Sequence, residues 1–166
     1  MPITPGHVPM RFSTWICAAA LLGSVQAWGS MLTGVVVGVH DGDTLTVLID
    51  RHPVKVRLAE IDAPELGQPY GTRSRHSLSA ICFRAQADIE RISKDRYGRT
   101  VAHVVCNGRD ANAEQVQQGM AWVYDRYTRP DSPLYGLQER ALSERRGLWV
   151  DRDAVAPWTW RRAVKR

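Results

Sequence analysis

Residues 33–61 read TGVVVGVHDGDTLTVLIDRHPVKVRLAEI. Apolar residues recur at every second position in three runs, and this period indicates β-strands with one buried face. The three expected strands cover residues 33–39, 44–50 and 54–61. Asp41-Gly42 favours a hairpin turn between the first two strands, and His52-Pro53 is expected to break the second. Three strands joined by short turns predict an antiparallel meander.

The period then changes to that of a helix. Helical spacing places four residues on one stripe: Leu78, Ile81, Cys82 and Ala85. The helix is expected to begin near Thr72 or Ser74. Two further strands are expected over residues 87–92 and 100–106, separated by a polar turn.

Two more helices are expected downstream. Asn112 can cap the first of them, which should end at Gly119. Ser132-Pro133 opens the second, and Gly147 ends it. The inward face of this last helix is expected to carry Leu134, Leu137, Ala141 and Leu142.

Five strands with a helix between the third and the fourth favour an α+β fold. We expect a five-stranded Greek-key β-barrel of the OB type, with about three helices packed outside. The domain is assigned to residues 28–155, and residues 156–166 form a basic C-terminal tail that we expect to be frayed. Such barrels often bind nucleic acid, but a fold alone assigns no function.

The N-terminus indicates export. Residues 12–25 are uncharged and mostly apolar, Arg11 precedes them, and Val25-Gln26-Ala27 suits signal peptidase. Fourteen residues are short for a membrane span, which needs roughly 20. We therefore expect residues 1–27 to be a signal peptide, with translation starting at Met1 or Met10. The destination is the periplasm or the medium, and an uncleaved membrane anchor is the alternative.

The charge favours a polyanionic partner. The chain has 22 basic and 17 acidic residues, a formal charge of +5, and cleavage of residues 1–27 would remove only Arg11 and leave +4. We expect a monomer that binds nucleic acid and has no stable membrane association after cleavage.

Acidic residues cluster at the expected strand ends. They are Asp41, Asp43, Asp62 and Glu65. Carboxylates that converge on one rim of a barrel would need a cation, and hard oxygen ligands favour calcium or magnesium. Arg57 and Arg99 could reach the same rim and bond a phosphate bidentately. Each motif has a simpler interpretation as well: Asp41–Thr44 as a hairpin turn, residues 62–65 as a cap of the next element, and Arg57 as a solvated side chain.

Four motifs in order carry a more specific signal. They are Asp-Gly-Asp-Thr (41–44), Val-Arg-Leu-x-x-Ile-Asp-Ala-Pro-Glu (56–65), Asp-Arg-Tyr-Gly-Arg (95–99) and Asn-Ala-Glu-Gln-Val-x-x-Gly-Met-Ala (112–121). With Gly-Leu-Trp at 147–149, this order resembles the staphylococcal-nuclease-like (thermonuclease) family over roughly residues 33–150. The resemblance implies a calcium-dependent endonuclease that hydrolyses DNA, with RNA as a further candidate substrate, and leaves 3′-phosphate ends.

The resemblance also implies roles for single residues. Calcium would be held by the carboxylates of Asp43 and Asp62 and by the main-chain carbonyl of Ala63. Glu65 would orient or deprotonate the attacking water. Arg57 and Arg99 would bind the phosphate and stabilise the transition state, while Tyr97 would contact the nucleotide phosphate.

Two departures from the family pattern concern substrate binding. The loop at residues 66–71 is short and lacks basic residues that the best-known member carries there. Asp125 falls about where that member has a second nucleotide-contacting tyrosine; the candidates to replace it are Trp122, Tyr124 and Tyr127. The alternative functions are a catalytically silent barrel that binds nucleic acid and an envelope-anchored structural protein.

Two cysteines remain after residue 27, Cys82 and Cys106. Cys82 lies on the inward stripe of the first helix, and Cys106 ends a strand that this helix should cover. In an exported chain such a pair can form a disulfide. We expect a Cys82–Cys106 bond; two buried free thiols are the alternative.

Overall fold

The computed structural model describes Met1 and residues 31–164. The expected signal peptide, residues 1–27, lies outside these residues apart from Met1. Within the described residues, no helix has both the length and the apolar character to cross a membrane.

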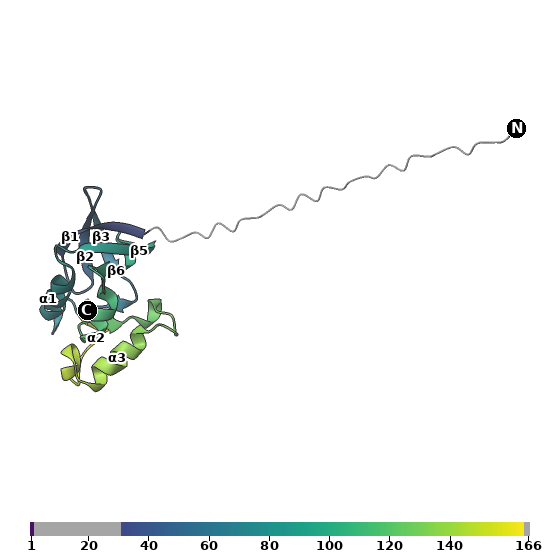
Figure 1. The fold of residues 1–166 in the computed structure, drawn as a ribbon. Helices are drawn as coiled ribbons and strands as arrows, with labels where there is room; N and C mark the ends of the chain where they lie inside the picture. Colours follow the sequence, from purple (N-terminus) through teal and green to yellow (C-terminus); the bar gives the residue numbers. More distant parts are fainter. Residues whose placement is uncertain (2–30, 165–166) are drawn as a thin grey trace.

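The main sheet is a closed five-stranded barrel, which forms the upper part of the folded body in Figure 1. Its strands are β1 (Met31–Val39), β2 (Thr44–Ile49), β3 (His52–Leu58), β5 (Gln86–Lys94) and β6 (Thr100–Cys106). Neighbours pair antiparallel in the order β3-β2-β1-β5-β6, and parallel pairing of β3 with β6 closes the barrel. The short β7 (Arg109–Asp110) extends the sheet beyond β6. The α+β barrel predicted from the alternating sequence is confirmed.

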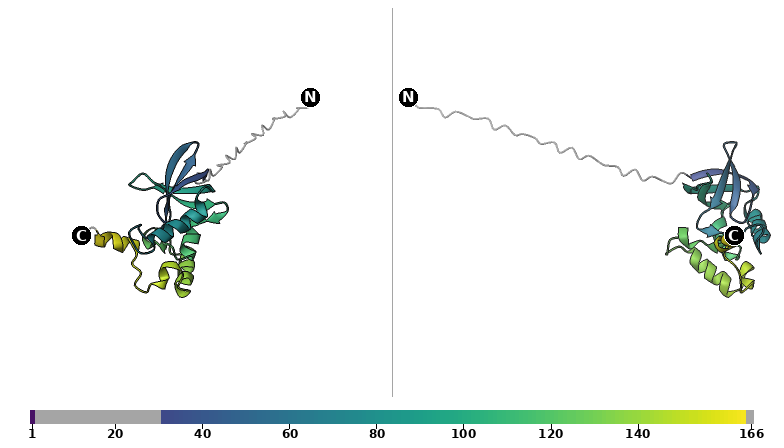
Figure 2. Two further views of the ribbon diagram at one scale, coloured as in Figure 1. Left: turned by 90° about the vertical axis from the view of Figure 1, so that its left-hand side faces the viewer. Right: turned by 180° about the vertical axis from the view of Figure 1, so that it is seen from behind.

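The helices gather around one end of this barrel (Figures 1 and 2). They are α1 (Gly71–Cys82), α2 (Ala111–Gln117), α3 (Leu134–Ser143) and α4 (Pro157–Val164), with 3₁₀ turns η1 (Asp125–Tyr127) and η2 (Gly147–Val150). A separate two-stranded ladder joins β4 (Ile61–Asp62) to β8 (Trp122–Val123). In Figure 2, α4 leads away from the body to the described end of the chain.

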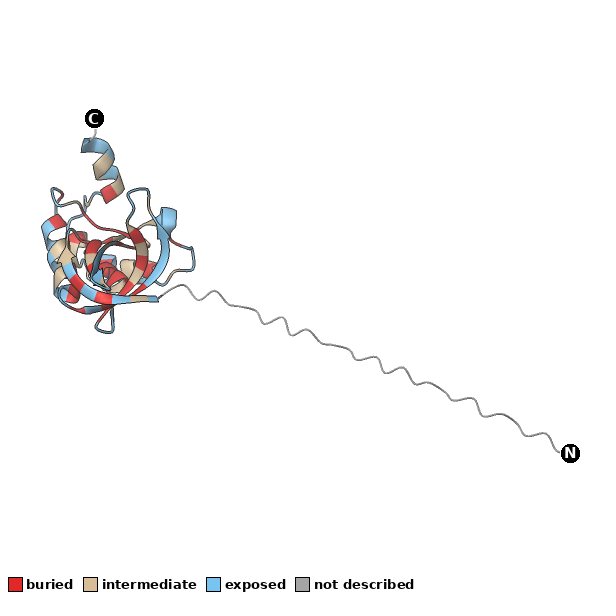
Figure 3. Ribbon diagram, turned by 90° about the horizontal axis from the view of Figure 1, so that it is seen from above, coloured by how far each residue is buried: buried red, intermediate tan, exposed pale blue. Residues whose placement is uncertain are grey.

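The core lies between the inner faces of the strands and the helices. Buried and exposed residues alternate along the strands (Figure 3), as the period of two in the sequence requires. Its largest fully buried side chains include Leu45, Leu58, Ile61, Leu78, Ile89, Val56 and Val104. Burying a side chain of this size contributes about 1.5–3 kcal/mol to folding. Leu78, Ile81 and Cys82 are buried as the helical stripe predicts.

Two strand boundaries differ from the sequence prediction. His52-Pro53 does not break a strand: both residues belong to β3, and the turn lies at Asp50-Arg51, whose φ angles are both positive. A proline is accepted there because β3 pairs with β6 only from Val56 onward, so the first part of β3 is an edge. At the other end β3 stops at Leu58, because the chain turns through a positive φ at Glu60 before β4.

Three features of the helices also differ. Asn112 does not cap α2: Asp110 accepts the bond from Ala113 N, while Asn112 is buried and bonds the backbone of Val104 and Ala59. Leu142 is exposed, and α3 ends before Gly147. The expectation of a frayed tail is wrong for residues 157–164, which form α4.

The Sγ atoms of Cys82 and Cys106 are bonded in the structure, and the two Cα atoms lie 5.2 Å apart. This separation lies inside the range that a disulfide allows. Cys82 is the last residue of α1 and Cys106 the last of β6, so the bond would attach the helix to the barrel wall.

Candidate active site

Strand register brings the first site residues together. Thr44, at the start of β2, pairs with Arg57 near the end of β3. Arg57 also pairs with Val101, just after the start of β6. Asp43 therefore precedes β2 and Arg99 precedes β6 at the same rim of the barrel where Arg57 ends its strand.

Asp43, Asp62 and Arg57 form a compact ion cluster at this rim. The Arg57 Nη1 atom lies 2.6 Å from Oδ2 of Asp43, and its Nη2 lies 2.8 Å from Oδ1 of Asp62. Asp43 is 5% exposed and Asp62 is 1% exposed, so both carboxylates have lost most of their water. A buried charge is costly unless it is paired, and Arg57 supplies the pairing for both acids.

Burial affects the protonation of both acids. Burial raises the pKa of Asp43 to about 6; the charge of Arg57 opposes this shift and the charge of Asp41 adds to it. Burial also raises the pKa of Asp62, while the hydrogen bonds from Arg161 and the charge of Arg57 lower it. Both groups thus depend on neighbouring cations to stay ionised.

The Asp41–Asp43 turn packs tightly against its neighbours. The Asp41 carboxylate accepts a 3.0 Å bond from Asp43 N, and the Asp43 carboxylate accepts a 2.6 Å bond from Ala63 N. A Cβ atom at Gly42 would lie 1.8 Å from the Ser74 Oγ atom, so only glycine fits there. The turn that carries Asp43 is therefore fixed to the Ala63 backbone on one side and to α1 on the other.

A buried side-chain amide on α2 also holds the Asp41–Asp43 turn in place. The Gln115 side chain of α2 is fully buried, and its Nε2 donates to the Gly42 carbonyl at 2.6 Å and to the Ser74 carbonyl at 3.1 Å. The motif at 112–121 thus supports the site through packing: Asn112 links β6 to the turn after β3, and Gln115 holds the Asp41–Asp43 turn. Periodicity alone could not reveal this, because it distinguishes buried from exposed positions but not the partners of a buried amide.

Glu65 lies on the loop after β4, and its carboxylate is 41% exposed. Gln68 ties this loop together: its Oε1 accepts from Glu65 N, and its backbone N–H donates to the Glu65 carbonyl. Arg161 of α4 contacts the Glu65 carboxylate at 2.7 Å and also bonds Asp62. Sequence analysis missed Arg161, because the run Trp158-Thr159-Trp160-Arg161-Arg162 was interpreted as part of a frayed tail. The available signal was the presence of two tryptophans and two adjacent arginines within five residues.

Arg99 and Tyr97 lie at the edge of the cluster. The Arg99 Nε donates to Asp95 at 2.6 Å, and its Nη1 lies 3.4 Å from the Thr44 hydroxyl, next to Asp43. Tyr97 is 68% exposed, with the Arg99 guanidinium 5.6 Å from its ring centroid. Tyr97 and Arg99 therefore lie beside the acidic rim, where a large substrate can reach both side chains.

The three aromatic candidates for the second tyrosine position differ in their surroundings. Tyr124 stacks on Trp158 with ring centroids 5.1 Å apart, and Trp122 packs edge-on against Trp149 and Trp158. Tyr127 is 65% exposed. Of these three side chains, Tyr127 is the most accessible to a ligand.

The donor set fits a hard divalent cation. One guanidinium bonds both Asp43 and Asp62, so oxygens of the two carboxylates lie close enough to share a single cation. No three acidic, histidine or cysteine side chains among the described residues form a metal cluster by themselves, so main-chain oxygen or water would complete the coordination. The expected carbonyl of Ala63 lies directly after Asp62, and no soft donor is part of the cluster.

The closed OB-type barrel carries paired acids and arginines on one rim. Forked guanidiniums in such a cluster are suited to bind a phosphate group. A family model described as staphylococcal nuclease homologue matches residues 55–151. The chain is 43% identical over 158 residues to a micrococcal nuclease of Shigella flexneri, covering 89% of this chain and 90% of that protein. It is also 43% identical over 154 residues to protein ParB of Escherichia coli, covering 87% and 86%. It is 44% identical over 132 residues to an uncharacterized endonuclease of Haemophilus influenzae, covering 78% and 73%. The chain belongs to the staphylococcal-nuclease-like family of nucleases.

Proposed function

We propose that this protein is an exported calcium-dependent nuclease that hydrolyses phosphodiester bonds of DNA, and of RNA as a second substrate, and leaves 3′-phosphate ends. The observation that carries the proposal is the rim cluster, in which Arg57 bonds both Asp43 and Asp62 at 2.6 and 2.8 Å and Glu65 stands beside them. The nuclease family of the chain supports the reaction class, and the excess of basic residues supports a polyanionic substrate.

The two rim arginines are suited to bind the phosphate. Within the described contacts, Arg57 bonds Asp43, Asp62 and the Leu58 carbonyl, which leaves its Nε–H and one Nη2–H for a phosphate oxygen. Arg99 engages Asp95 and Thr44 and keeps the N–H groups of Nη2. Planar guanidiniums bond phosphate oxygens bidentately, and they stabilise the charge that builds up in the transition state.

Glu65 is suited to handle the attacking water, because its half-exposed carboxylate lies next to Asp62 yet is open to solvent. In the proposed step, the water oxygen attacks phosphorus while one of its protons passes toward Glu65. The bond from phosphorus to O5′ breaks, O5′ takes up a proton, and the 3′ side keeps the phosphate. Asp43, Asp62 and the carbonyl of Ala63 would hold calcium, which supplies charge neutralisation at the phosphate when bound.

Incubation of the purified protein with labelled duplex DNA and with RNA tests this proposal. We expect cleavage with calcium and none with EGTA. The products should become substrates for polymerase extension only after a phosphatase has removed their 3′-phosphates. Nucleic-acid binding without cleavage under all conditions would instead favour the catalytically silent barrel.

Export is a separate part of the proposal. The apolar segment at 12–25 and the Val25-Gln26-Ala27 sequence support cleavage after Ala27. N-terminal sequencing of protein recovered outside the cytoplasm should begin at Trp28. An intact N-terminus in a membrane fraction would show that the segment is an anchor. Size-exclusion chromatography of the recovered protein tests the expected monomer.

A further inference from the structure

The α4 helix is anchored beside the rim by aromatic packing. Trp158 stacks on Tyr124 with the two rings 3° from parallel, and its ring centroid lies 5.9 Å from that of Trp122. Pro157, the first residue of α4, is buried. These contacts attach α4 to β8 and the following segment, so the position of the helix relative to the barrel is defined.

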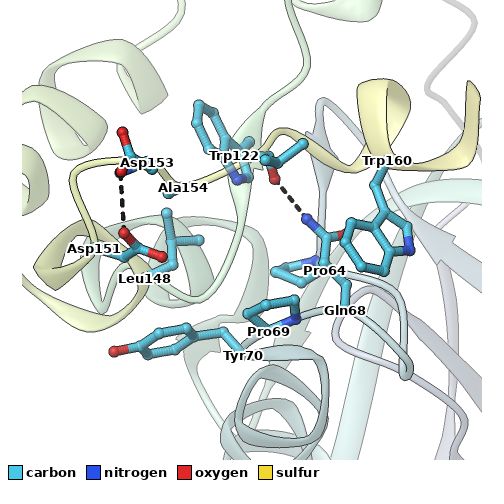
Figure 4. Close-up of a pocket in the computed structure, with 11 residues that line it drawn as sticks. Pro64, Gln68, Pro69, Tyr70, Trp122, Leu148, Asp151, Asp153, Ala154 and Trp160 are labelled. Carbon is cyan, nitrogen blue, oxygen red and sulfur yellow. Dashed lines mark hydrogen bonds between the residues drawn. The ribbon is translucent and has the colours of Figure 1, made fainter. Parts of the chain in front are cut away.

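The linker before α4, residues 151–156, is fastened to the loop that carries Glu65. The Gln68 amide donates to the Val155 carbonyl at 2.5 Å, drawn as a dashed line in Figure 4. The linker and the Glu65 loop line a small cavity of about 50 Å³. Its lining includes Pro64 and Gln68 of the loop and Trp160 of α4 (Figure 4). The α4 linker and the Glu65 loop thus form one packed unit.

Arg161 reaches from this unit into the ion cluster. Its Nη2 lies 2.7 Å from Oδ2 of Asp62, and its Nη1 lies 3.2 Å from Oδ1 of Asp62 and 2.7 Å from Oε1 of Glu65. The Arg161 guanidinium therefore binds both oxygens of the Asp62 carboxylate through its two terminal nitrogens. One of these nitrogens, Nη1, also binds the Glu65 carboxylate. Among the described residues, this is the one side chain that bonds the Glu65 carboxylate.

The geometry points to Arg161 as a positioning residue that acts through Glu65. We infer that α4 completes the site, because Arg161 fixes the half-exposed Glu65 carboxylate beside Asp62 in the orientation that water activation requires. This inference rests on the proposed nuclease function and assigns Arg161 a part in it. A carboxylate on a surface loop loses rotational freedom when a guanidinium binds it. Such preorganisation favours the transition state.

Two other roles of Arg161 make different predictions. If Arg161 blocked the acids, its removal would speed the reaction, because the site would be freed. If Arg161 were a phosphate ligand in its own right, its removal would slow the reaction whether or not Glu65 were present. In each of these cases the side chain acts independently of Glu65, whereas a positioning residue does not.

A double-mutant cycle between Arg161 and Glu65 separates these roles. Arg161→Gln should lower kcat on the order of 10- to 100-fold, as the loss of an outer partner of a metal-site group typically does. The apparent KM should change little. In a Glu65→Gln background, the same Arg161→Gln change should have almost no further effect on kcat. Arg161→Lys, which keeps the charge but loses the fork, should recover only part of the rate.

The matched control is Arg162→Gln, which removes the same charge from the same helix. Within the part of the chain that the structure describes, Arg162 bonds only the Thr159 hydroxyl of its own helix. This variant should keep the wild-type kcat. Calcium binding, measured by calorimetry without substrate, should be as tight or several-fold tighter in Arg161→Gln, because a cation next to Asp62 has been removed. Melting temperatures of all variants report whether the fold is kept.

Any of the following results would overturn the inference. The first is an equal loss of kcat in the wild-type and Glu65→Gln backgrounds. The second is a faster Arg161→Gln enzyme with tighter calcium binding, which would show that Arg161 blocks the site. The third is loss of calcium binding in Arg161→Gln. If the wild-type protein does not cleave, the proposed function fails and this inference fails with it. If it cleaves and Arg161→Gln cleaves equally well, only the inference fails.

Discussion

Breaking the Cys82–Cys106 bond should destabilise the protein without inactivating it. The bond joins two residues that are 24 positions apart in the sequence. In the chain-entropy model, a loop of this length corresponds to about 3.5 kcal/mol at 25 °C. For a domain of roughly 135 residues, the unfolding entropy near the melting temperature is about 0.28 kcal/mol/K, so the loss corresponds to about 12 °C.

Catalysis should survive because the bond lies at the far end of the barrel wall. β6 begins at Thr100, directly after Arg99 at the rim, and its seven residues end at Cys106. An extended strand of that length spans about 20 Å. At a temperature well below the melting point, the reduced protein should therefore cleave DNA at nearly the same rate as the oxidised protein.

The assay compares urea unfolding curves recorded with and without a strong reductant, because both cysteines are fully buried and become accessible on unfolding. The variant Cys82→Ala/Cys106→Ala is the control and should give the same curve in both conditions. Two free thiols in the mass spectrum of the non-reduced protein would refute the reasoning. So would a reductant-induced shift in melting temperature, measured in a parallel thermal scan, of less than about 3 °C.

Three other predictions address catalysis, packing and substrate binding. Arg57→Lys and Arg99→Lys should each lower kcat on the order of 10²–10³-fold in a steady-state assay, because an ammonium cannot form the planar fork; near-normal turnover would exclude the bidentate role. Gly42→Ala should lower the free energy of unfolding, measured in urea, by about 1–3 kcal/mol, because its Cβ would lie 1.8 Å from the Ser74 Oγ. The control Gly67→Ala meets nothing within 4 Å and should be nearly neutral. Equal stabilities of the two variants would contradict this packing. The apparent KM should rise with salt to the same extent on two unrelated duplexes, since phosphate contacts dominate binding; a flat response or preference for one sequence would contradict this picture.

Strand periodicity carried most of the fold prediction. The alternation in residues 33–61 defines β2 and most of β3, because each strand has one face in the core. The register depends on the turn as well: the turn at Asp50-Arg51 pairs Thr44 with Arg57, and this pairing brings Asp43 and Arg57 to one rim. The strand ends were less predictable: Asp50-Arg51 forms the tight turn through two positive φ angles, which neither residue type requires.

The supporting residues of the site were harder to predict for a different reason. Asn112 has the side chain of a helix cap, and a local sequence rule assigns it that role. In the structure Asp110 takes the cap, and Asn112 is buried and bonds the backbone of Val104 in β6 and of Ala59 in the turn after β3. Arg161 reaches Asp62 across 99 positions of sequence, and only the docking of Trp158 brings it there. Contacts of this kind depend on tertiary packing, which no local pattern encodes.

We propose that Asp43 and Asp62 hold a calcium ion on which cleavage depends. The most direct measurement returns calcium to EGTA-treated protein while recording calcium binding by calorimetry and DNA cleavage in parallel. We predict that binding and cleavage rise together in the wild-type protein, and that Asp43→Ala weakens binding severely and abolishes cleavage over the same calcium range. Full cleavage in EGTA without added metal, or cleavage by Asp43→Ala at the wild-type calcium concentration, would contradict the account.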